Sequence, residues 1–398
     1  MTSRAYPTQH RDHRPHTMQD TRIIRLGEAG LDDRLTRLRD GAIAVAGRRR
    51  VGPAWRLLVD ALPPREAGPV LFARDPAGVS AIVGRRLWPE ASVTAHHMDA
   101  WEAHIASRNL ATNDSDDVEI ALTSDLPPGP FRLIAIPFPA RAESLYGREL
   151  IERAHDALVD KGRLIASTDG SPSWLRRVVK EVFGRADLQG TSRSGAVVSA
   201  RRTRSDQRVR DHDHLVRFSR GDRELELLTR PGVFSPGRLD PGTKALLGAF
   251  TASPGELVLD LGCGIGALGL AAAVDADPAG ITMVDSNARA VAVAAANAER
   301  NGLEAASTVL RADLEELPVG VHRALANPPY FSHGRIAAAF ARAAASALRA
   351  DGVLHMVVKA VDLHRDLLRS FFEEVRVEAV ASYSVLHARG PRSAPTQG

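Results

Sequence analysis

Cysteine, lysine and long apolar runs are scarce in this chain of 398 residues, which contains one cysteine and four lysines. The single Cys263 excludes an intrachain disulfide and a zinc site built from several cysteines, so we expect a reducing compartment. The longest run without a charged residue, 261–274, is too short to span a membrane, and the N-terminus lacks the apolar segment of a secretion signal. We therefore predict a cytoplasmic protein that involves neither a membrane nor a metal.

The order of the predicted elements indicates two α/β domains. With 44% hydrophobic residues, a chain of this length can bury two cores of ordinary size. Strand and helix patterns alternate along residues 21–200 and again along 217–390, which predicts two tandem Rossmann-like domains with mostly parallel sheets. Residues 1–20 and 391–398 are predicted tails, and 201–216 a basic linker. Prolines interrupt the first tail, so its three histidines lack the rigid scaffold of a metal site.

Arginine carries most of the basic charge, yet the net charge is only +4, which alone is weak support for a nucleic-acid partner. The predicted linker is more informative because residues 201–210 hold five arginines and one acid. Such a segment either lies along a phosphate backbone or is simply a solvated connector. The arginines are Arg201, Arg202, Arg204, Arg208 and Arg210.

A glycine-rich turn lies between a predicted strand, 256–259, and a predicted helix, 267–274. Its missing side chains would let a cofactor approach the backbone at the start of the helix. The spacing fits the dinucleotide pattern G-x-G-x-x-G/A as well as an S-adenosylmethionine site, and Asp285 lies where either cofactor would need a ribose-binding acid. The glycines are Gly262, Gly264 and Gly266.

Acidic residues favour S-adenosylmethionine over a dinucleotide. Asp260 ends the strand before the glycines, where a carboxylate can serve a positively charged amino-acid group but is unhelpful to a pyrophosphate. Asp313 follows a predicted strand, 309–313, and can accept a hydrogen bond from an adenine amine. The alternative for Asp313 is a helix N-cap, because acidic residues follow it.

The motif Asn327-Pro328-Pro329-Tyr330 predicts the target of methyl transfer. A ring-conjugated amine is a poor nucleophile, so a site must accept its hydrogens; the Asn327 side-chain oxygen and the Pro328 carbonyl can do this. Pro329 stiffens the turn, and Tyr330 offers a face on which a flat group can stack. Alone, the motif could be a proline-rich turn after the predicted strand 322–326, but it follows an ordered cofactor pattern. The combination predicts an N-methyltransferase.

Two stretches of the chain match at nearly constant separation, which predicts an internal duplication. Ile136 aligns with Asn327 at an offset of 191 residues, and Gly162 aligns with Gly352 at an offset of 190. In the first copy, isoleucine replaces the acceptor asparagine, and the segment 72–78 keeps one glycine and introduces an arginine and a proline. We expect the first copy to be degenerate and unable to bind S-adenosylmethionine. The alternative is a chance alignment of two unrelated α/β domains.

The order of these motifs resembles the two-domain ribosomal RNA guanine-N2 methyltransferases, the small-subunit methyltransferase C type and its large-subunit relatives. The likeness also includes Gly-Val-Phe-Ser and Leu-Asp-x-Gly-Thr within 232–243 and the closing Val-Leu-x-Ala-Arg at 385–389. It implies a class I S-adenosylmethionine-dependent enzyme that methylates the exocyclic amine of a guanine, with ribosomal RNA or a ribosomal subunit as partner and a first domain that aids RNA binding and stability. By motif, the resemblance assigns the cofactor to Asp260, Gly262, Gly264, Gly266, Asp285 and Asp313, and the target amine to Asn327, Pro328, Pro329 and Tyr330.

Three other functions remain open from the residues alone. The same motif would suit methylation of a glutamine amide in a release factor or of adenine N6, because both groups present a planar amine. A non-enzymatic RNA-binding protein is a third possibility, but the intact motifs of the second domain argue against it.

Overall fold

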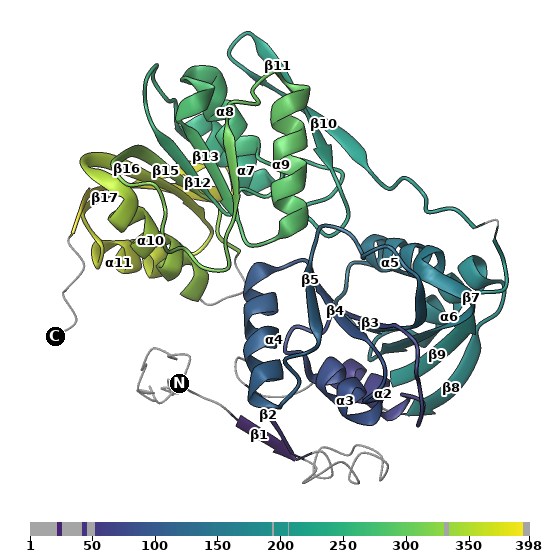
Figure 1. The fold of residues 1–398 in the computed structure, drawn as a ribbon. Helices are drawn as coiled ribbons and strands as arrows, with labels where there is room; N and C mark the ends of the chain where they lie inside the picture. Colours follow the sequence, from purple (N-terminus) through teal and green to yellow (C-terminus); the bar gives the residue numbers. More distant parts are fainter. Residues whose placement is uncertain are drawn as a thin grey trace, which may run out of the picture.

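The computed structural model describes residues 22–25, 42–45, 52–192, 195–205, 207–329 and 334–392. Most of these residues form two α/β domains, the first in the lower half of Figure 1 and the second in the upper half. The predicted tail 1–20 and residues 393–398 of the predicted C-terminal tail lie outside the described residues. Within the described ranges, every helix is too short or too polar to cross a membrane.

The first domain alternates strands and helices, as the sequence pattern predicts. A short antiparallel pair, β1 (Arg22–Arg25) and β2 (Ala42–Val45), precedes it. Its elements are α2 (Pro53–Asp60), β3 (Val70–Ala73), α3 (Val79–Leu87), β4 (Val93–His97), α4 (Ala100–Thr112), β5 (Glu119–Leu122), β6 (Phe131–Phe138), α5 (Ser144–Ala157), β7 (Leu158–Thr168), α6 (Pro172–Phe183), β8 (Asp187–Ser192) and β9 (Gly195–Arg201).

The second domain opens with a hairpin and then repeats the alternation. Its elements are β10 (His214–Arg220), β11 (Arg223–Thr229), α7 (Pro241–Ala249), β12 (Val258–Leu261), α8 (Ala267–Asp275), η3 (Pro278–Gly280), β13 (Ile281–Asp285), α9 (Ala288–Arg300), β14 (Ser307–Leu310), β15 (Val321–Ala326), α10 (Arg335–Ala347), β16 (Leu348–Val358), α11 (Val361–Arg369), β17 (Phe372–Val380) and β18 (Tyr383–Pro391).

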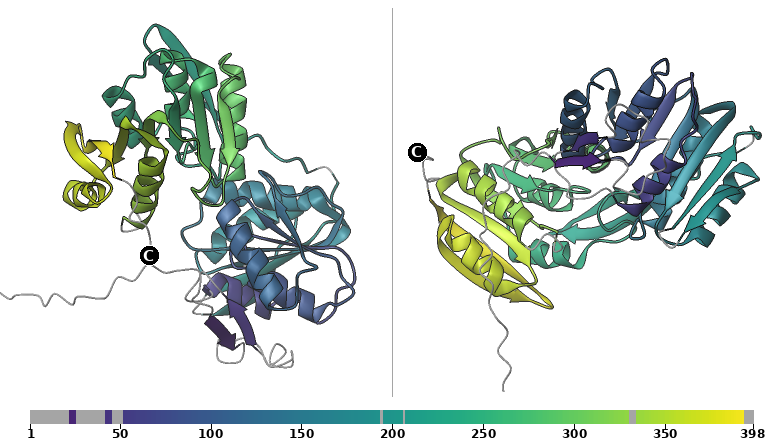
Figure 2. Two further views of the ribbon diagram at one scale, coloured as in Figure 1. Left: turned by 60° about the vertical axis from the view of Figure 1, so that its left-hand side comes forward. Right: turned by 90° about the horizontal axis from the view of Figure 1, so that it is seen from below.

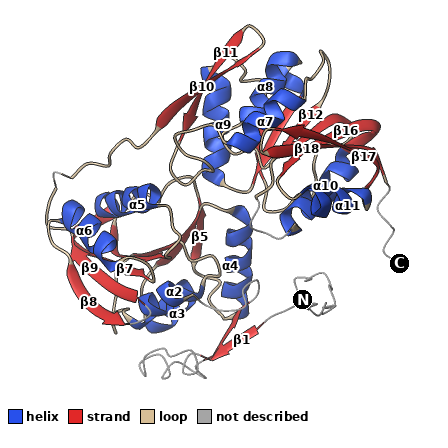
Figure 3. Ribbon diagram, turned by 180° about the vertical axis from the view of Figure 1, so that it is seen from behind, coloured by secondary structure: helices blue, strands red, loops and turns tan. Residues whose placement is uncertain are grey.

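Both domains contain a seven-stranded sheet with the same strand order. The orders are β5-β4-β3-β6-β7-β9-β8 and β14-β13-β12-β15-β16-β18-β17, with five parallel strands and an antiparallel edge in each sheet. Every residue of β3 and β12 is buried, as expected of apolar strands covered on both faces. Helices lie on both sides of each sheet (Figure 3). The predicted fold of two tandem Rossmann-like domains is confirmed.

Equivalent hydrogen bonds in the two domains support the internal duplication. In α4, Asn109 donates to the carbonyl of Ala77 at 2.9 Å, and in α9 Asn297 donates to the carbonyl of Ile265 at 2.9 Å. The two donors lie 188 residues apart in the sequence, and so do the two acceptors. One turn later in each helix, a second asparagine donates to the carbonyl of the first. The chance that unrelated domains share this whole arrangement is small, so we infer that the two halves are copies.

The strand registers correct one residue of the predicted alignment. Phe72 pairs with Ala135, and its equivalent Asp260 pairs with Leu325, so the offset is 190 residues after the central strand. Pro137 rather than Ile136 therefore corresponds to Asn327. The connection before β15 is two residues longer than that before β6, which local pattern matching did not resolve. Proline lacks a side-chain acceptor too, so the first copy still lacks the asparagine.

The two domains meet through corresponding turns. The N–H of Ala100 donates to the carbonyl of Ser286, and the N–H of Ala288 donates to the carbonyl of Met98, both at 2.7 Å. The two donors are related by the same 188-residue offset, and so are the two acceptors. Asp99 forms an antiparallel bridge with its own counterpart, Asn287. The contact is therefore isologous, as in a twofold symmetric dimer. Figure 2 shows the two domains side by side from two further directions.

A fully buried arginine, Arg289, lies beside this contact. Its guanidinium donates to Glu149 and Asp125 of the first domain, at distances of 2.8 to 3.2 Å, and to the Pro231 carbonyl at 2.6 Å. The Nε–H donates to the Ser124 carbonyl at 2.8 Å, so all five N–H groups have acceptors. Arginine supplies this fork of donors in one plane, which joins both domains and the segment after β11.

The connection between the domains is shorter than the predicted linker 201–216, because β9 ends at Arg201 and β10 begins at His214. It runs along the outer edge of the molecule in Figure 1. Two of its arginines bind the first domain: Arg202 donates to the Leu158 carbonyl, and Arg210 lies 3.5 Å from Glu152. The linker is therefore partly docked, and its contribution to RNA binding remains a prediction.

Replacing Arg289 with alanine should destabilise the protein by about 3 kcal/mol, because its buried hydrogen bonds are lost and Glu149 keeps only Arg153 and Arg230 as charged partners. Chemical denaturation of the variant would measure the loss. Arg300→Ala on the same helix removes a 43%-exposed partner of Glu226 and should cost less than about 1 kcal/mol. Equal losses for the two variants would contradict a special role for the buried arginine.

Candidate active site

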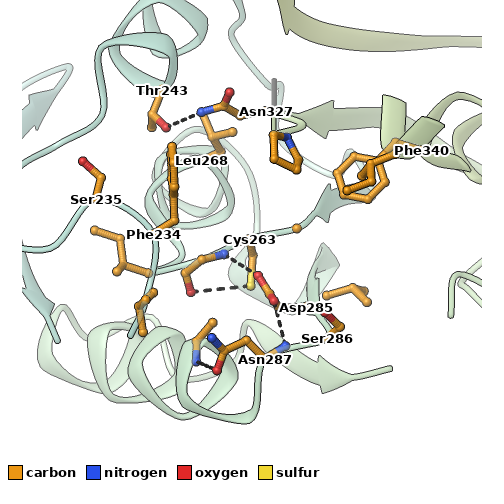
Figure 4. A pocket seen from close by; sticks show the side chains of 18 of the residues that line it. Phe234, Ser235, Thr243, Cys263, Leu268, Asp285, Ser286, Asn287, Asn327 and Phe340 are labelled. Carbon is orange, nitrogen blue, oxygen red and sulfur yellow. Dashed lines mark hydrogen bonds between the residues drawn. The ribbon is translucent and has the colours of Figure 1, made fainter. Parts of the chain in front are cut away.

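A cavity of about 740 Å³ opens at the carboxyl ends of the central strands of the second sheet. This edge is where open α/β sheets bind ligands. The glycine loop after β12, the turn after β13, the loop after β14 and Asn327 after β15 line it together (Figure 4). The strand order thus brings the separate sequence motifs to one place.

The glycine loop leaves its backbone open to the cavity. The loop residues Gly262, Gly264 and Gly266 have φ values of 70°, 56° and 82°, which other residues rarely adopt. A Cβ on Gly262 would lie 2.9 Å from the Phe340 ring, whereas a Cβ on Gly264 would meet no atom within 4 Å. Because Gly264 lines the cavity, a ligand can approach its backbone where a side chain would otherwise stand.

Asp285 ties the glycine loop to the turn after β13. Its Oδ2 accepts from the N–H of Gly264, and its Oδ1 accepts from the N–H of Asn287, both at 2.9 Å. Burial raises the pKa of this carboxyl, and the backbone hydrogen bonds oppose the shift. Each carboxylate oxygen offers a further lone pair. Since Asp285 lines the cavity, it can also accept from a ligand hydroxyl.

Asp260 does not line the cavity described above. The side chain is fully buried, and its Oδ2 accepts from the N–H of Gly269 in the first turn of α8 at 2.9 Å. Its Oδ1 is buried without a hydrogen-bond partner, and burial raises the pKa of the carboxyl to about 7. The position indicates that Asp260 supports the glycine loop from beneath, which differs from the predicted direct contact with a cofactor.

Asp313 lines the cavity from the loop after β14. The strand ends at Leu310, three residues earlier than the predicted 309–313. No helix occurs in residues 311–320, all of which the structure describes, so Asp313 is not a helix N-cap. Its Oδ1 instead accepts from the N–H of Glu315 at 3.1 Å and closes a local turn. The exposed carboxylate can accept from a ligand amine.

The orientation of the Asn327 amide is set by two neighbours. Its Nδ2 donates to Asp240 Oδ2 and to Thr243 Oγ1, both at 3.0 Å. An ionised carboxylate only accepts hydrogen bonds, so the nitrogen end of the amide must face Asp240. The oxygen end is turned away from these residues. Asp240 also caps α7 by accepting from the N–H of Thr243, which fixes it in place.

The segment between β11 and α7 covers one side of the cavity with Phe234 and Ser235 (Figure 4). Both domains hold its start: Gly232 donates to Glu143 of the first domain at 3.0 Å and accepts from the side chain of Asn287 of the second domain at 2.9 Å. Phe234 is 58% exposed, although it is a large apolar side chain. The first domain therefore helps to position a loop that carries an exposed aromatic ring.

The cavity includes most, but not all, of the residues that the sequence predicted. Pro328 is buried, Gly266 packs beside Met283, and neither lines the cavity. Tyr330 lies outside the described residues. The predicted residues that line the cavity are Gly262, Gly264, Asp285, Asp313, Asn327 and Pro329.

Several cavity residues escaped the sequence analysis. Ser286 and Asn287 directly follow Asp285, so their place after the strand could have indicated them. Asp99 and Trp101 belong to the first domain and reach the cavity only because the domains pack together. No local pattern predicts that contact, although the constant offset between the copies aligns Asp99 with Asn287.

Residues 224–387 match the methyltransferase small domain family. The chain is 35% identical over 170 residues to Ribosomal RNA small subunit methyltransferase C of Hahella chejuensis, a match that covers 41% of this chain and 49% of that protein. It is 29% identical to Ribosomal RNA large subunit methyltransferase G of Stutzerimonas stutzeri, over 73% of this chain and 80% of that protein. A solved 16S rRNA N2 methyltransferase of T. thermophilus has the same fold, with a TM-score of 0.72 and 21% identity over 88% of this chain and 95% of that chain.

The family match falls in the second domain, and the solved T. thermophilus enzyme shares the fold of both domains. The matched region of the Hahella chejuensis protein is about half its length, and the Stutzerimonas stutzeri match includes both domains.

In this protein, bulky or apolar residues occupy the first domain's counterparts of the glycine-loop motif. Arg74 has a φ of 58° and corresponds to Gly262. Its guanidinium lies 5.5 Å from the Tyr146 ring centre, and burial lowers the pKa of the arginine. The first domain has Phe72, Arg74, Pro76 and His97 where the second has Asp260, Gly262, Gly264 and Asp285.

A substitute carboxylate preserves the helix start in the degenerate domain. Asp75 accepts from the N–H of Ser80 at 2.6 Å and of Ala81 at 3.1 Å. Ala81 is the counterpart of Gly269, which donates to Asp260 in the second domain. The first domain has therefore kept the structural function of the acid at a new position while changing the loop beside it.

Asp260→Asn should flatten the pH dependence of the protein's stability. The folded state raises the pKa of Asp260 from 3.8 to about 7, so the contribution of this group to stability is fully present below about pH 4 and is lost as pH rises through about 7. A neutral asparagine lacks this proton linkage. Urea denaturation at pH 5 and pH 8 should give a smaller difference for the variant, by at most about 3 kcal/mol, because about two pH units lie between pH 5 and the raised pKa. Parallel wild-type and variant profiles would show that Asp260 does not carry the linkage.

Proposed function

We propose that the cavity binds S-adenosylmethionine and that the chain transfers its methyl group to the exocyclic amine of a guanine in ribosomal RNA. The observation that carries the proposal is the locked amide of Asn327, whose oxygen end turns away from Asp240 and Thr243 at the wall of a glycine-lined cavity. The names of the relatives support the choice of substrate. So does the T. thermophilus enzyme, which was solved in complex with AdoMet and guanosine.

The residues present fit the proposed cofactor. Gly264 leaves open space beside its backbone, which suits the amino-acid end. Asp285 has lone pairs for ribose hydroxyls, and Asp313 is placed to accept from an adenine amine. When bound, S-adenosylmethionine supplies an electrophilic methyl group on a positively charged sulfur. Cys263 takes no part as a nucleophile, because burial raises the pKa of its thiol well above the ordinary value.

Asn327 would hold the guanine amine by accepting one of its hydrogens. Positive charge develops on that nitrogen during methyl transfer, and a fixed acceptor stabilises it without reorganisation. The carbonyl of Pro328 is the proposed second acceptor, since proline has no N–H that would compete. Asp240 and Thr243 act through Asn327, so we assign them as positioning residues. No side-chain base is needed, because the methylated amine is acidic enough to lose its proton afterwards.

Ribosomal RNA or a ribosomal subunit is the proposed partner, in the cytoplasm. The exposed ring of Phe234 lines the same cavity as Pro329 and can stack on a base that is turned out of the RNA. Tyr330 is proposed for the same purpose from its place in the motif. The exposed arginines of the linker, such as Arg208, can bind phosphates without reading sequence.

The full-length protein is incubated with labelled S-adenosylmethionine and, in separate reactions, with ribosomal RNA, with separate ribosomal subunits or with a release factor. The reactions that contain RNA should produce labelled N2-methylguanosine. Mass spectrometry of nucleosides from the digested RNA would identify the product. The Asn327→Ala protein serves as the control for a contaminating activity. Label found only in N6-methyladenosine would replace guanine by adenine as the target. Label found only in a glutamine of the release factor would reject RNA as the substrate.

Asn327→Ala should reduce turnover by roughly a hundredfold or more, because losing one positioned electrostatic partner costs about 2.7–4 kcal/mol in comparable sites. Its affinity for S-adenosylmethionine, measured by calorimetry, should change little. Thr243→Val keeps the shape of the side chain and removes one acceptor for the amide, so a smaller loss of roughly fivefold is expected. A parallel loss of cofactor affinity in Asn327→Ala would instead make Asn327 a cofactor-binding residue.

A further inference from the structure

Trp101 is an exposed aromatic residue from the degenerate domain that reaches the cavity of the other domain. It lies in the first turn of α4, and 42% of its surface is exposed. It lines the cavity together with Asp99, whose Oδ2 accepts from the hydroxyl of Ser286 at 2.6 Å. Ser286 follows Asp285, so this wall of the cavity adjoins the proposed ribose-binding acid.

The symmetry of the domain contact identifies the counterpart of Trp101. Adding the offset of 188 residues that relates Asp99 to Asn287 relates Trp101 to Arg289. Arg289 crosses in the opposite direction and binds Asp125 and the Ser124 carbonyl of the first domain.

The groups that Arg289 binds have counterparts in the cavity. The registers of β5 and β14 relate Ser124 to Ala312 and Asp125 to Asp313. Likewise the offset of 190 after β6 and β15 relates Glu149, a third partner of Arg289, to Ala339. These counterparts, Ala312, Asp313 and Ala339, all line the cavity with Trp101. The twofold relation thus puts Trp101 at the end of the cavity that holds Asp313.

The two side chains that reach across the domain contact, Arg289 and Trp101, differ in how much open space remains beside them. Arg289 is fully buried, and ion pairs with Glu149 and Asp125 fill its side of the contact. On the other side the counterparts are Asp313 and the small Ala339, and the indole of Trp101 borders open space. A flat apolar ring beside a carboxylate acceptor suits a planar heterocycle that has an exocyclic amine.

We propose that Trp101 is the cross-domain wall of the adenosine subsite, so that the degenerate domain contributes directly to cofactor binding. This inference rests on the proposed function, because it takes S-adenosylmethionine as the ligand. The indole would contact the adenine ring while Asp313 accepts from the adenine amine. Asp99 positions Ser286 beside them through the hydroxyl hydrogen bond.

Calorimetry on the full-length protein tests this assignment with S-adenosylmethionine, S-adenosylhomocysteine and 5′-methylthioadenosine, which lacks the amino-acid end. Trp101→Ala should weaken all three ligands by roughly tenfold or more, as expected for loss of an aromatic face on a base. Trp101→Phe should restore most of the affinity. Leu188→Ala removes another exposed apolar side chain of the same domain, 45% exposed and outside the cavity lining, and should leave binding unchanged.

Tryptophan fluorescence gives a second readout. Adding 5′-methylthioadenosine to the wild-type protein should quench emission, and Trp101→Phe should abolish most of the quenching while retaining the ligand. Thermal unfolding of Trp101→Ala close to that of the wild type would confirm that the variant is folded.

The outcomes separate this inference from the proposed function. Unchanged affinity in Trp101→Ala, with tight binding by the wild type, overturns the role of Trp101 and leaves the methyltransferase proposal intact. Weakened S-adenosylmethionine binding with unchanged 5′-methylthioadenosine binding also overturns it, because the effect would lie at the amino-acid end. A wild-type protein that binds none of the three ligands overturns both proposals.

Discussion

The guanidinium of Arg289 is the interaction on which the arrangement of the two domains depends. It uses all five donors in a fully buried position, with acceptors from the first domain and from the segment after β11. Arg230 joins the same carboxylates, Asp125 and Glu149, at 3.0 and 3.3 Å. Burial raises the pKa of Asp125, but Arg153, Arg230 and Arg289 outweigh it and lower the pKa overall. The positive and negative charges of the cluster compensate one another, so removing either an arginine or a carboxylate destabilises the protein.

The position of this cluster explains why a degenerate domain persists in a chain with one complete motif set. Glu149 and Asp125 correspond to Ala339 and Asp313, which line the cavity of the second domain. Two arginines, Arg74 and Arg289, lie among the counterparts of cavity residues in the first domain. The first domain's counterpart of the cavity is part of the interdomain core. From there it holds Gly232 through Glu143 and so sets the start of the loop that carries Phe234.

Local patterns were sufficient to predict the elements and the order of the motifs. The predicted helix 267–274 differs from α8 by one residue at its end, because the glycine turn before it marks where the helix begins. The glycine loop was predictable because its positive φ values require the residue type itself. Asp260 was harder: its place in the motif suggested a ligand contact, while its side chain turns under the loop to Gly269. Side-chain direction at a strand end depends on packing that the sequence does not state.

Contacts between the domains could not be predicted in the same way. Trp101 resembles any surface aromatic residue until the turn that carries it is docked against Ser286. The alignment of the copies was also one residue off at Ile136, because short apolar matches do not fix a loop-length difference. Register pairs across the sheet resolved it, since each strand is held to its neighbour by backbone hydrogen bonds.

The isologous contact between Asp99 and Asn287 has the geometry of a homodimer interface, although one chain supplies both sides. In a true homodimer, a mutation at the crossing position would appear twice, and both binding sites would change together. Fusion of the two copies removes that constraint. The two crossing positions accordingly differ, with tryptophan at one and arginine at the other, so a change at either position alters one side of the contact alone.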